Sequence, residues 1–294
     1  MTPRKLTALH LSLQLAALVL TLTTSIGWVG QSFHGFRLDP ALFVSIINSA
    51  HWEGPKAGIQ PEDQIQALDG VRMDSYEQFE AAIRSRAPGD SMNLEILRGD
   101  ATQSLSLRVQ AFTWGDWRDT TIPVLFLWLV LVAMATVTHL KAPPGAVASM
   151  PLLVFQGALA LYVLAGVEFD LGGHLGPLGW LAFQAVSWSA LMLALAFPTP
   201  VLRWAGFPVV LRNCVGFGSI ALGLLTIIAL EQATRVPSDH RLYTWVVWQG
   251  SAILAFLATV SLLASLALRA WRTRNLLHRR QAQITLVGAL VAFL

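Results

Sequence analysis

The residues that could do chemistry in this 294-residue sequence are few and widely spaced. A zinc hydrolase would need two histidines in a His-Glu-x-x-His pair on one helical face, and the sequence holds seven histidines but no such pair. A serine peptidase would need a Gly-x-Ser-x-Gly turn with a histidine partner, and Gly218-Ser219-Ile220 is only a fragment of that turn. We therefore expect no enzyme activity, no catalytic residue, no metal and no cofactor in this chain.

Three further features are typical of binding chemistry but have simpler explanations. The glycine-rich stretch 172–177 has no lysine and no preceding soluble strand, so it reads as a turn between helices rather than a phosphate loop. The basic run 269–280 directly follows an apolar run, which favours contact with anionic lipid headgroups over nucleic acid. The one cysteine, Cys214, cannot form an intramolecular disulfide.

The composition places most of the chain in lipid. Apolar residues make up 54% of it and charged residues 13%, where a soluble protein carries roughly 25% charged residues. Six apolar runs are long enough to cross about 30 Å of hydrocarbon: 6–29, 122–138, 147–167, 178–197, 209–230 and 243–268. The first run is long and lacks a small-x-small cleavage site, so we interpret it as an anchor. No histidine or acid lies near the middle of a run, which disfavours a transporter.

The basic residues of the short loops predict the orientation. With a cytoplasmic N-terminus, the inside segments hold Arg4, Lys5, Lys141, Arg203, Arg212, Arg269, Arg272, Arg274, Arg279 and Arg280. The outside loops then hold only Arg235 and Arg241. We therefore expect a multi-pass membrane protein with a cytoplasmic N-terminus, in which the segment between the first two runs lies outside the cytoplasm.

That segment is a water-soluble island. It holds 13 of the 17 acidic residues, between Asp39 and Asp119. The pattern predicts strands over 42–47 and 65–68, a tight turn at Asp69-Gly70, and a helix with Ser75 and Gln78 in a capping box and a stripe of Tyr76, Phe79 and Ile83. Alternation over 92–96 and again over 105–109 predicts a hairpin with one wet face.

These elements, together with three short motifs, resemble a bacterial PDZ domain over residues 35–109. The motifs are Ala57-Gly58-Ile59, Pro61-Glu62-Asp63-Gln64-Ile65 and Ala87-Pro88-Gly89-Asp90. The family usually has glycine where Glu62 stands. The expected fold class is therefore a polytopic α-helical membrane protein with an extracytoplasmic PDZ-like domain, a small β-barrel plus helix.

The resemblance implies that a peptide or protein segment binds by adding a strand. Carried onto this chain, the peptide-binding groove would run along Phe43, Ser45 and Ile47, opposite Phe79 and Ile83. The alternative that these side chains are simply core stays open. The candidate carboxylate loop is Gly35-Phe36, but Asp39-Pro40 follows too closely for a good match, so recognition of a free C-terminus also stays open.

The whole architecture resembles the input module of competence-type bacterial sensor histidine kinases. It divides into an N-terminal transmembrane anchor (1–29), the PDZ-like domain (30–117) and a multi-helix transmembrane region (118–294). We expect a sensory input region that contacts a peptide and membrane lipid but no nucleic acid, with homodimer formation left open. The alternative is a membrane scaffold whose PDZ-like domain tethers an envelope protein or protease. Because the last run, 284–294, is too short to cross, we expect the chain to be a fragment whose output domain lies further on.

Overall fold

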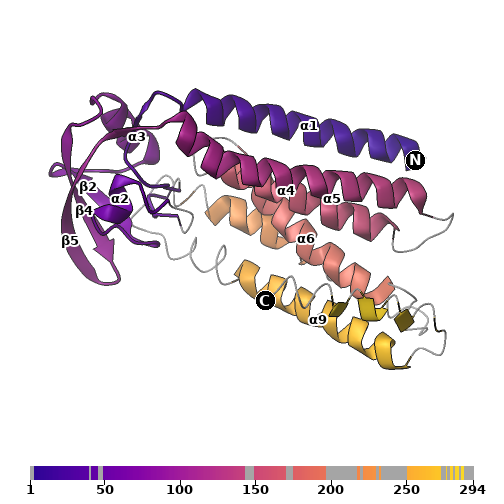
Figure 1. Cartoon of the computed structure of the whole chain (residues 1–294). Coiled ribbons are helices and arrows are strands. Elements are labelled where there is room, and N and C mark those ends of the chain that lie inside the picture. The colour runs from indigo at the N-terminus through magenta and orange to yellow at the C-terminus, as the bar shows by residue number, and fades with distance from the viewer. Residues whose placement is uncertain are drawn as a thin grey trace.

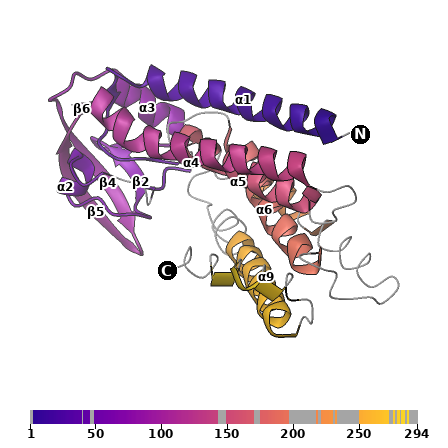
Figure 2. The same ribbon diagram turned by 45° about the vertical axis from the view of Figure 1, so that its right-hand side comes forward.

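The computed structural model describes residues 3–39, 41–45, 49–142, 149–169, 175–196, 217–218, 221–229, 232, 250–272 and scattered positions between 276 and 287. A sheet-containing domain lies at one end of a set of long helices that run side by side (Figure 1). The domain connects the first of these helices to the second, and the view turned by 45° shows it at the same end of both (Figure 2).

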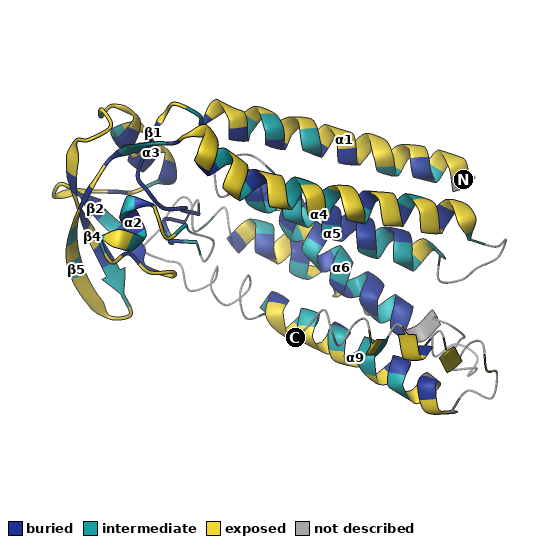
Figure 3. Cartoon of the chain, viewed as in Figure 1, coloured by how far each residue is buried: buried dark blue, intermediate teal, exposed yellow. Residues whose placement is uncertain are grey.

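Within the described part of the chain, five helices are long and apolar enough to cross a membrane. They are α1 (Pro3–Gly27), α4 (Trp114–Lys141), α5 (Ser149–Phe169), α6 (Gly176–Ala196) and α9 (Ser251–Arg272). The outward sides of α1, α4 and α9 are exposed, whereas α5 and α6 are mostly buried or intermediate (Figure 3). Phe126 of α4 and Phe256 of α9 are among the most exposed large apolar side chains. Of the predicted run 209–230 the structure describes residues 217–218 and 221–229, and of the predicted run 284–294 only residues 284, 286 and 287.

Helix α4 begins eight residues before the predicted apolar run. Thr113 caps it, because the Thr113 hydroxyl accepts a hydrogen bond from the backbone N–H of Asp116 (3.2 Å) and the Asp116 carboxylate accepts one from the backbone N–H of Thr113 (2.8 Å). Such a capping box satisfies donors that the first helical turn leaves unpaired. Hydropathy alone places the start of α4 too late, because the first two turns of this helix, residues 114–121, contain several polar side chains.

Buried polar contacts join the helices. The Gln14 side chain of α1 donates to the Gly157 carbonyl of α5 (2.8 Å) and accepts from Trp128 Nε1 of α4 (2.9 Å). A Cβ atom placed on Gly157 would lie 2.6 Å from the ring of His10. Because glycine has no Cβ, α1 and α5 can approach each other closely at this position. Small residues allow such contact between apolar helices.

The domain contains a four-stranded antiparallel sheet. Its strands are β2 (Gln64–Leu68), β3 (Val71–Arg72), β4 (Ser91–Arg98) and β5 (Ala101–Arg108), in the order β3-β2-β4-β5. Strands β1 (Ser32–Phe33) and β6 (Gln110–Ala111) pair separately. The predicted Asp69-Gly70 turn and the predicted hairpin are both present. The predicted strand over 42–47 is reduced to single bridges at Phe43 and Val44, and residues 46–48 lie outside the described set.

Helix α3 (Tyr76–Arg84) covers the sheet with the predicted stripe. Phe79 and Ile83 have no exposed surface and belong to the domain's core. Ser75 caps the helix by accepting from the backbone N–H of Gln78, as predicted. The second half of the predicted capping box is displaced by one residue, because the Gln78 side chain accepts from the N–H of Asp74 instead of Ser75.

Candidate peptide-binding site

The candidate carboxylate loop lies between β1 and a short extended segment. Gly35 adopts a φ of +83°, a left-handed conformation that glycine adopts without steric cost. Its carbonyl accepts a hydrogen bond from the N–H of Gly54 (3.0 Å) in the short helix α2 (Glu53–Lys56). The loop over residues 33–36, called the Gly35 loop below, therefore rests directly on α2.

Helix α3 packs against this loop. The ring of Phe79 lies 6.3 Å from that of Phe36 and 5.3 Å from that of His34. The Nε2 atom of His34 also lies 3.0 Å from a carboxylate oxygen of Glu80, and both side chains are almost fully buried. The structure thus brings together three of the predicted site residues, Gly35, Phe36 and Phe79.

The predicted groove residues Phe43 and Ser45 lie on the next segment, which is paired on both sides. On one side the N–H of Ser45 donates to the Arg37 carbonyl, and on the other the N–H of Val44 donates to the Asp63 carbonyl. An added strand therefore has no free backbone edge at residues 43–45. Phe43 and Ser45 are half-buried, and Ile47 is outside the described residues.

A free backbone edge exists one segment earlier. Among the described residues, neither Phe36 nor Leu38 has a backbone hydrogen-bond partner, although both are fully buried. Buried backbone groups are almost always paired, so this edge between the extended segment 36–38 and α3 is where the backbone could pair with an incoming strand. The edge is closed in this structure, since no surface is exposed on Phe36, Leu38, Phe79 or Ile83. Helix α3 must therefore move away before a ligand strand can reach the backbone of residues 36 and 38.

A second group of contacts joins the domain to the helices. Trp28, at the end of α1, forms an aromatic cluster with Phe33, Trp52 and Phe112, and Val167 of α5 completes it. The ribbon formed by β1 and β6 lies beside this cluster and is extended by backbone hydrogen bonds of Phe112 with Gly30 and Gln31. No spacer separates the domain from α1 or α4.

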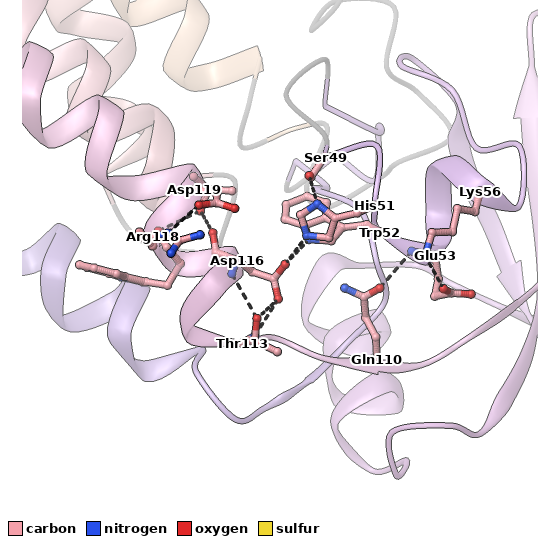
Figure 4. A network of polar contacts seen from close by, with 12 residues as sticks. Ser49, His51, Trp52, Glu53, Lys56, Gln110, Thr113, Asp116, Arg118 and Asp119 are labelled. Atoms are coloured by element: carbon pink, nitrogen blue, oxygen red, sulfur yellow. Dashed lines mark hydrogen bonds and ion pairs between the residues drawn. The ribbon is translucent and has the colours of Figure 1, made fainter.

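The carboxylate of Asp116, in the first turn of α4, is the polar centre of this junction (Figure 4). One oxygen accepts from Trp52 Nε1 at 2.7 Å and lies 2.8 Å from His51 Nε2. The other accepts from the backbone N–H and the hydroxyl of Thr113. Asp116 is 4% exposed, and these donors replace the water that a buried carboxylate loses.

Ser49, His51 and Asp116 form a hydrogen-bonded chain with the residue types of a hydrolase triad. The Ser49 hydroxyl lies 2.6 Å from His51 Nδ1, and His51 Nε2 faces Asp116. In a hydrolase the acid orients the histidine, which takes the serine proton during attack. Here the acid also completes the capping box of α4 and accepts from Trp52. We therefore interpret this series of hydrogen bonds as one that fixes residues 49–52 against α4.

Sequence reasoning missed this junction. Trp52 and Asp116 are 64 residues apart, and neither stands in a motif that predicts contact. The available signal was composition, since Trp28, Trp114 and Trp117 lie at the two ends of the soluble island and Trp52 lies within it.

A family model matches the sheet-containing domain. Residues 29–109 match the family model described as a PDZ domain. Among solved structures, an HtrA-type protease, AlgW with a decapeptide, is 15% identical over 27% of this chain and 29% of its own, with a TM-score of 0.25. An aminopeptidase N family protein from Idiomarina loihiensis is 21% identical over 28% of this chain and 14% of its own, with a TM-score of 0.24.

This chain therefore spans less than a third of the length of either structure. No curated protein matches it as a relative. Glu62 departs from the usual glycine, and its φ of +70° explains why the family favours glycine there. Residues 29–109 of this chain form a PDZ domain, joined directly to helices that are long and apolar enough to cross a membrane.

Proposed function

We propose that this chain is the membrane-embedded input region of a bacterial signalling protein. In this proposal the PDZ domain lies outside the cytoplasm, binds a peptide or protein segment, and changes the arrangement of the helices when it does so. The output domain would lie further along the chain or on a partner.

Binding is supported by the family and by the unpaired, buried backbone groups of Phe36 and Leu38. PDZ domains bind peptides or protein segments, and strand addition uses unpaired backbone groups of this kind. The Gly35 loop at one end of the edge and α3 along its side supply the two walls. Phe43, Ser45, Phe79 and Ile83 remain our proposed side-chain contacts, with Gly35 and Phe36 as the proposed carboxylate loop.

The observation that favours a sensor over a scaffold is the fixed junction around Asp116. A tether works with a flexible linker, because its only task is to keep a partner nearby. Here the indole of Trp52 and the imidazole of His51 bind the first turn of α4, and Trp28 packs the end of α1 into the domain. Movement of the domain must therefore displace these helices.

The first experiment tests binding with the full chain in lipid nanodiscs. The probe is a library of random decapeptides with free C-termini, and the same library amidated at the C-terminus is the control. Capture of a peptide subset supports the binding proposal, and loss of capture on amidation would assign carboxylate recognition to the Gly35 loop. Capture of no peptide from either library would overturn it.

The second experiment separates the sensor from the scaffold. Spin labels on cysteines at Arg4 and Met150 report the distance between the far ends of α1 and α5, in a Cys214→Ser background. A captured peptide changes this distance if the chain is a sensor. Binding without any change in the distance distribution would favour a scaffold that tethers an envelope protein or protease.

The proposed topology is tested in intact cells. A cysteine at Gln103, in β5, should react with a membrane-impermeant maleimide, whereas a cysteine at Lys141 should be protected until the cells are opened. Protection at Gln103 would contradict an extracytoplasmic PDZ domain, and with it the inner-membrane orientation with a cytoplasmic N-terminus.

A further inference from the structure

Helix α2 touches the Gly35 loop on one side with no room for a side chain. The N–H of Gly54 donates to the Gly35 carbonyl at 3.0 Å. A Cβ atom placed on Gly54 would lie 2.6 Å from that carbonyl oxygen and 2.8 Å from the ring of Phe36. Because packed groups at such distances cannot compress, a shift of the Gly35 loop must displace Gly54.

The same short helix reaches α4 on its other side. Trp52, its N-cap residue, is fully buried, and its indole N–H binds Asp116 at 2.7 Å. The edge of its ring also packs on Phe33, with 5.0 Å between ring centroids. Only Glu53 separates Trp52 from Gly54. Gly54 is held in the helical turn by hydrogen bonds from the backbone N–H groups of Ala57 and Ile59 to its carbonyl.

We propose that the segment from Trp52 to Lys56, called the α2 lever below, couples the Gly35 loop to the first turn of α4. This inference rests on the proposed function and names the contact that would carry its signal. A strand entering beside residues 36–38 displaces the Gly35 loop, the loop displaces Gly54, and Trp52 moves with it. The Asp116 carboxylate, which completes the capping box of α4, then loses or changes a hydrogen-bond donor.

The lever is attached at a third point that defines its motion. The backbone N–H of Glu53 donates to the side-chain oxygen of Gln110 in β6 at 3.0 Å. Gly54 and Trp52 lie on either side of this attachment along the chain. The attachment therefore serves as a pivot between the loop contact and the α4 contact.

The test uses hydrogen exchange of the full chain in nanodiscs, without any peptide. The variant Trp52→Phe keeps an aromatic ring but removes the donor to Asp116. We expect amides of residues 113–120 and of residues 33–37 to exchange about tenfold faster, which is the effect of losing one hydrogen bond to a charged group. Asp116→Asn should speed exchange in the Gly35 loop, although it lies in a different element.

A double variant measures the coupling itself. If the two residues act through one contact, Trp52→Phe combined with Asp116→Asn adds nothing to either single change. The matched control is Trp117→Phe, which removes an indole hydrogen bond to Ser25 of α1 (3.0 Å) at the same end of the helices. It should loosen α1 and α4 but leave the Gly35 loop at the parent rate.

Unchanged exchange in β4 and β5 shows that the domain is folded in each variant. The proposal is wrong if Trp52→Phe leaves residues 33–37 at the parent rate, or if the effects of the two single changes simply add. Because no peptide is present, that outcome leaves the binding proposal standing. Conversely, the absence of peptide capture in the library experiment leaves the coupling measurement valid.

Discussion

Replacing Glu62 by glycine should stabilise the PDZ domain. Glu62 adopts a φ of +70° and its side chain is exposed, so the substitution removes backbone strain without removing a buried contact. The left-handed conformation costs a residue with a Cβ about 1–2 kcal/mol. Against this, glycine lowers the stability by about 0.4–1 kcal/mol, because it gives the unfolded chain more conformational freedom. The net gain should be about 0.5–1 kcal/mol.

The change should leave the local hydrogen bonds intact. The backbone N–H of Glu62 donates to the Val44 carbonyl at 3.0 Å, and glycine supplies the same donor. The neighbouring Asp63 carboxylate keeps its two contacts to the Arg98 guanidinium, both at 2.7 Å. The effect measured is therefore that of conformation at one residue.

Hydrogen exchange of the β4 amides in the full chain measures the free energy of opening the domain. An increase of about 0.5–1 kcal/mol in this free energy slows exchange about two- to fivefold, because RT is about 0.59 kcal/mol. The control Glu77→Gly, in the exposed first turn of α3, should instead speed exchange, since glycine costs a helix about 1 kcal/mol relative to alanine. Faster exchange in Glu62→Gly would refute the assignment of strain to this position.

Three further predictions concern other parts of the molecule. Phe79→Ala should lower the stability of the domain by about 3–5 kcal/mol, seen in urea unfolding, and weaken peptide capture; capture at the parent level in a folded variant would show that Phe79 is core alone. Gly157→Leu should separate α1 from α5, because a Cβ atom at this position would lie 2.6 Å from the His10 ring. The separation is measured as a loss of disulfide cross-linking between cysteines introduced into the two helices. The hydrogen bond from the Asn93 backbone lowers the pKa of Asp69, and the hydrogen bond and positive charge of Arg86 lower it further, while desolvation opposes both. Its stabilising effect is complete above the ordinary aspartate pKa and is lost as the pH falls through the lowered value, so Asp69→Asn should flatten the acid limb of a stability–pH curve.

The parts of the fold predicted from sequence are those with local signals. The turn at Asp69-Gly70 is correct because both residues adopt positive φ, which this pair tolerates. Helix α3 is correct because its cap and apolar stripe lie within nine residues. Helices α5 and α6 begin within two residues of the predicted apolar runs.

The parts that were missed depend on contacts between distant residues. Helix α2 is four residues long and contains Gly54 and Pro55, a composition that predicts a turn. It forms where Gly54 packs against Gly35, 19 positions earlier, and no local pattern encodes that contact. The α4 start was missed for a similar reason, because Asp116 acquires its role from Trp52 and His51 as well as from Thr113.

The β1–β6 ribbon makes the PDZ domain an insertion into a helical hairpin. Its two strands run antiparallel and its hydrogen bonds hold Gly30 beside Phe112, so the chain leaves α1 and enters α4 through a single narrow neck. A torque applied to the domain therefore acts on both helices at once and turns them as a pair. Sliding of α1 along α4 would instead require the neck to shear and break its ladder. The natural motion of such a device is a common tilt or rotation of the hairpin against α5, the helix that both of its arms contact.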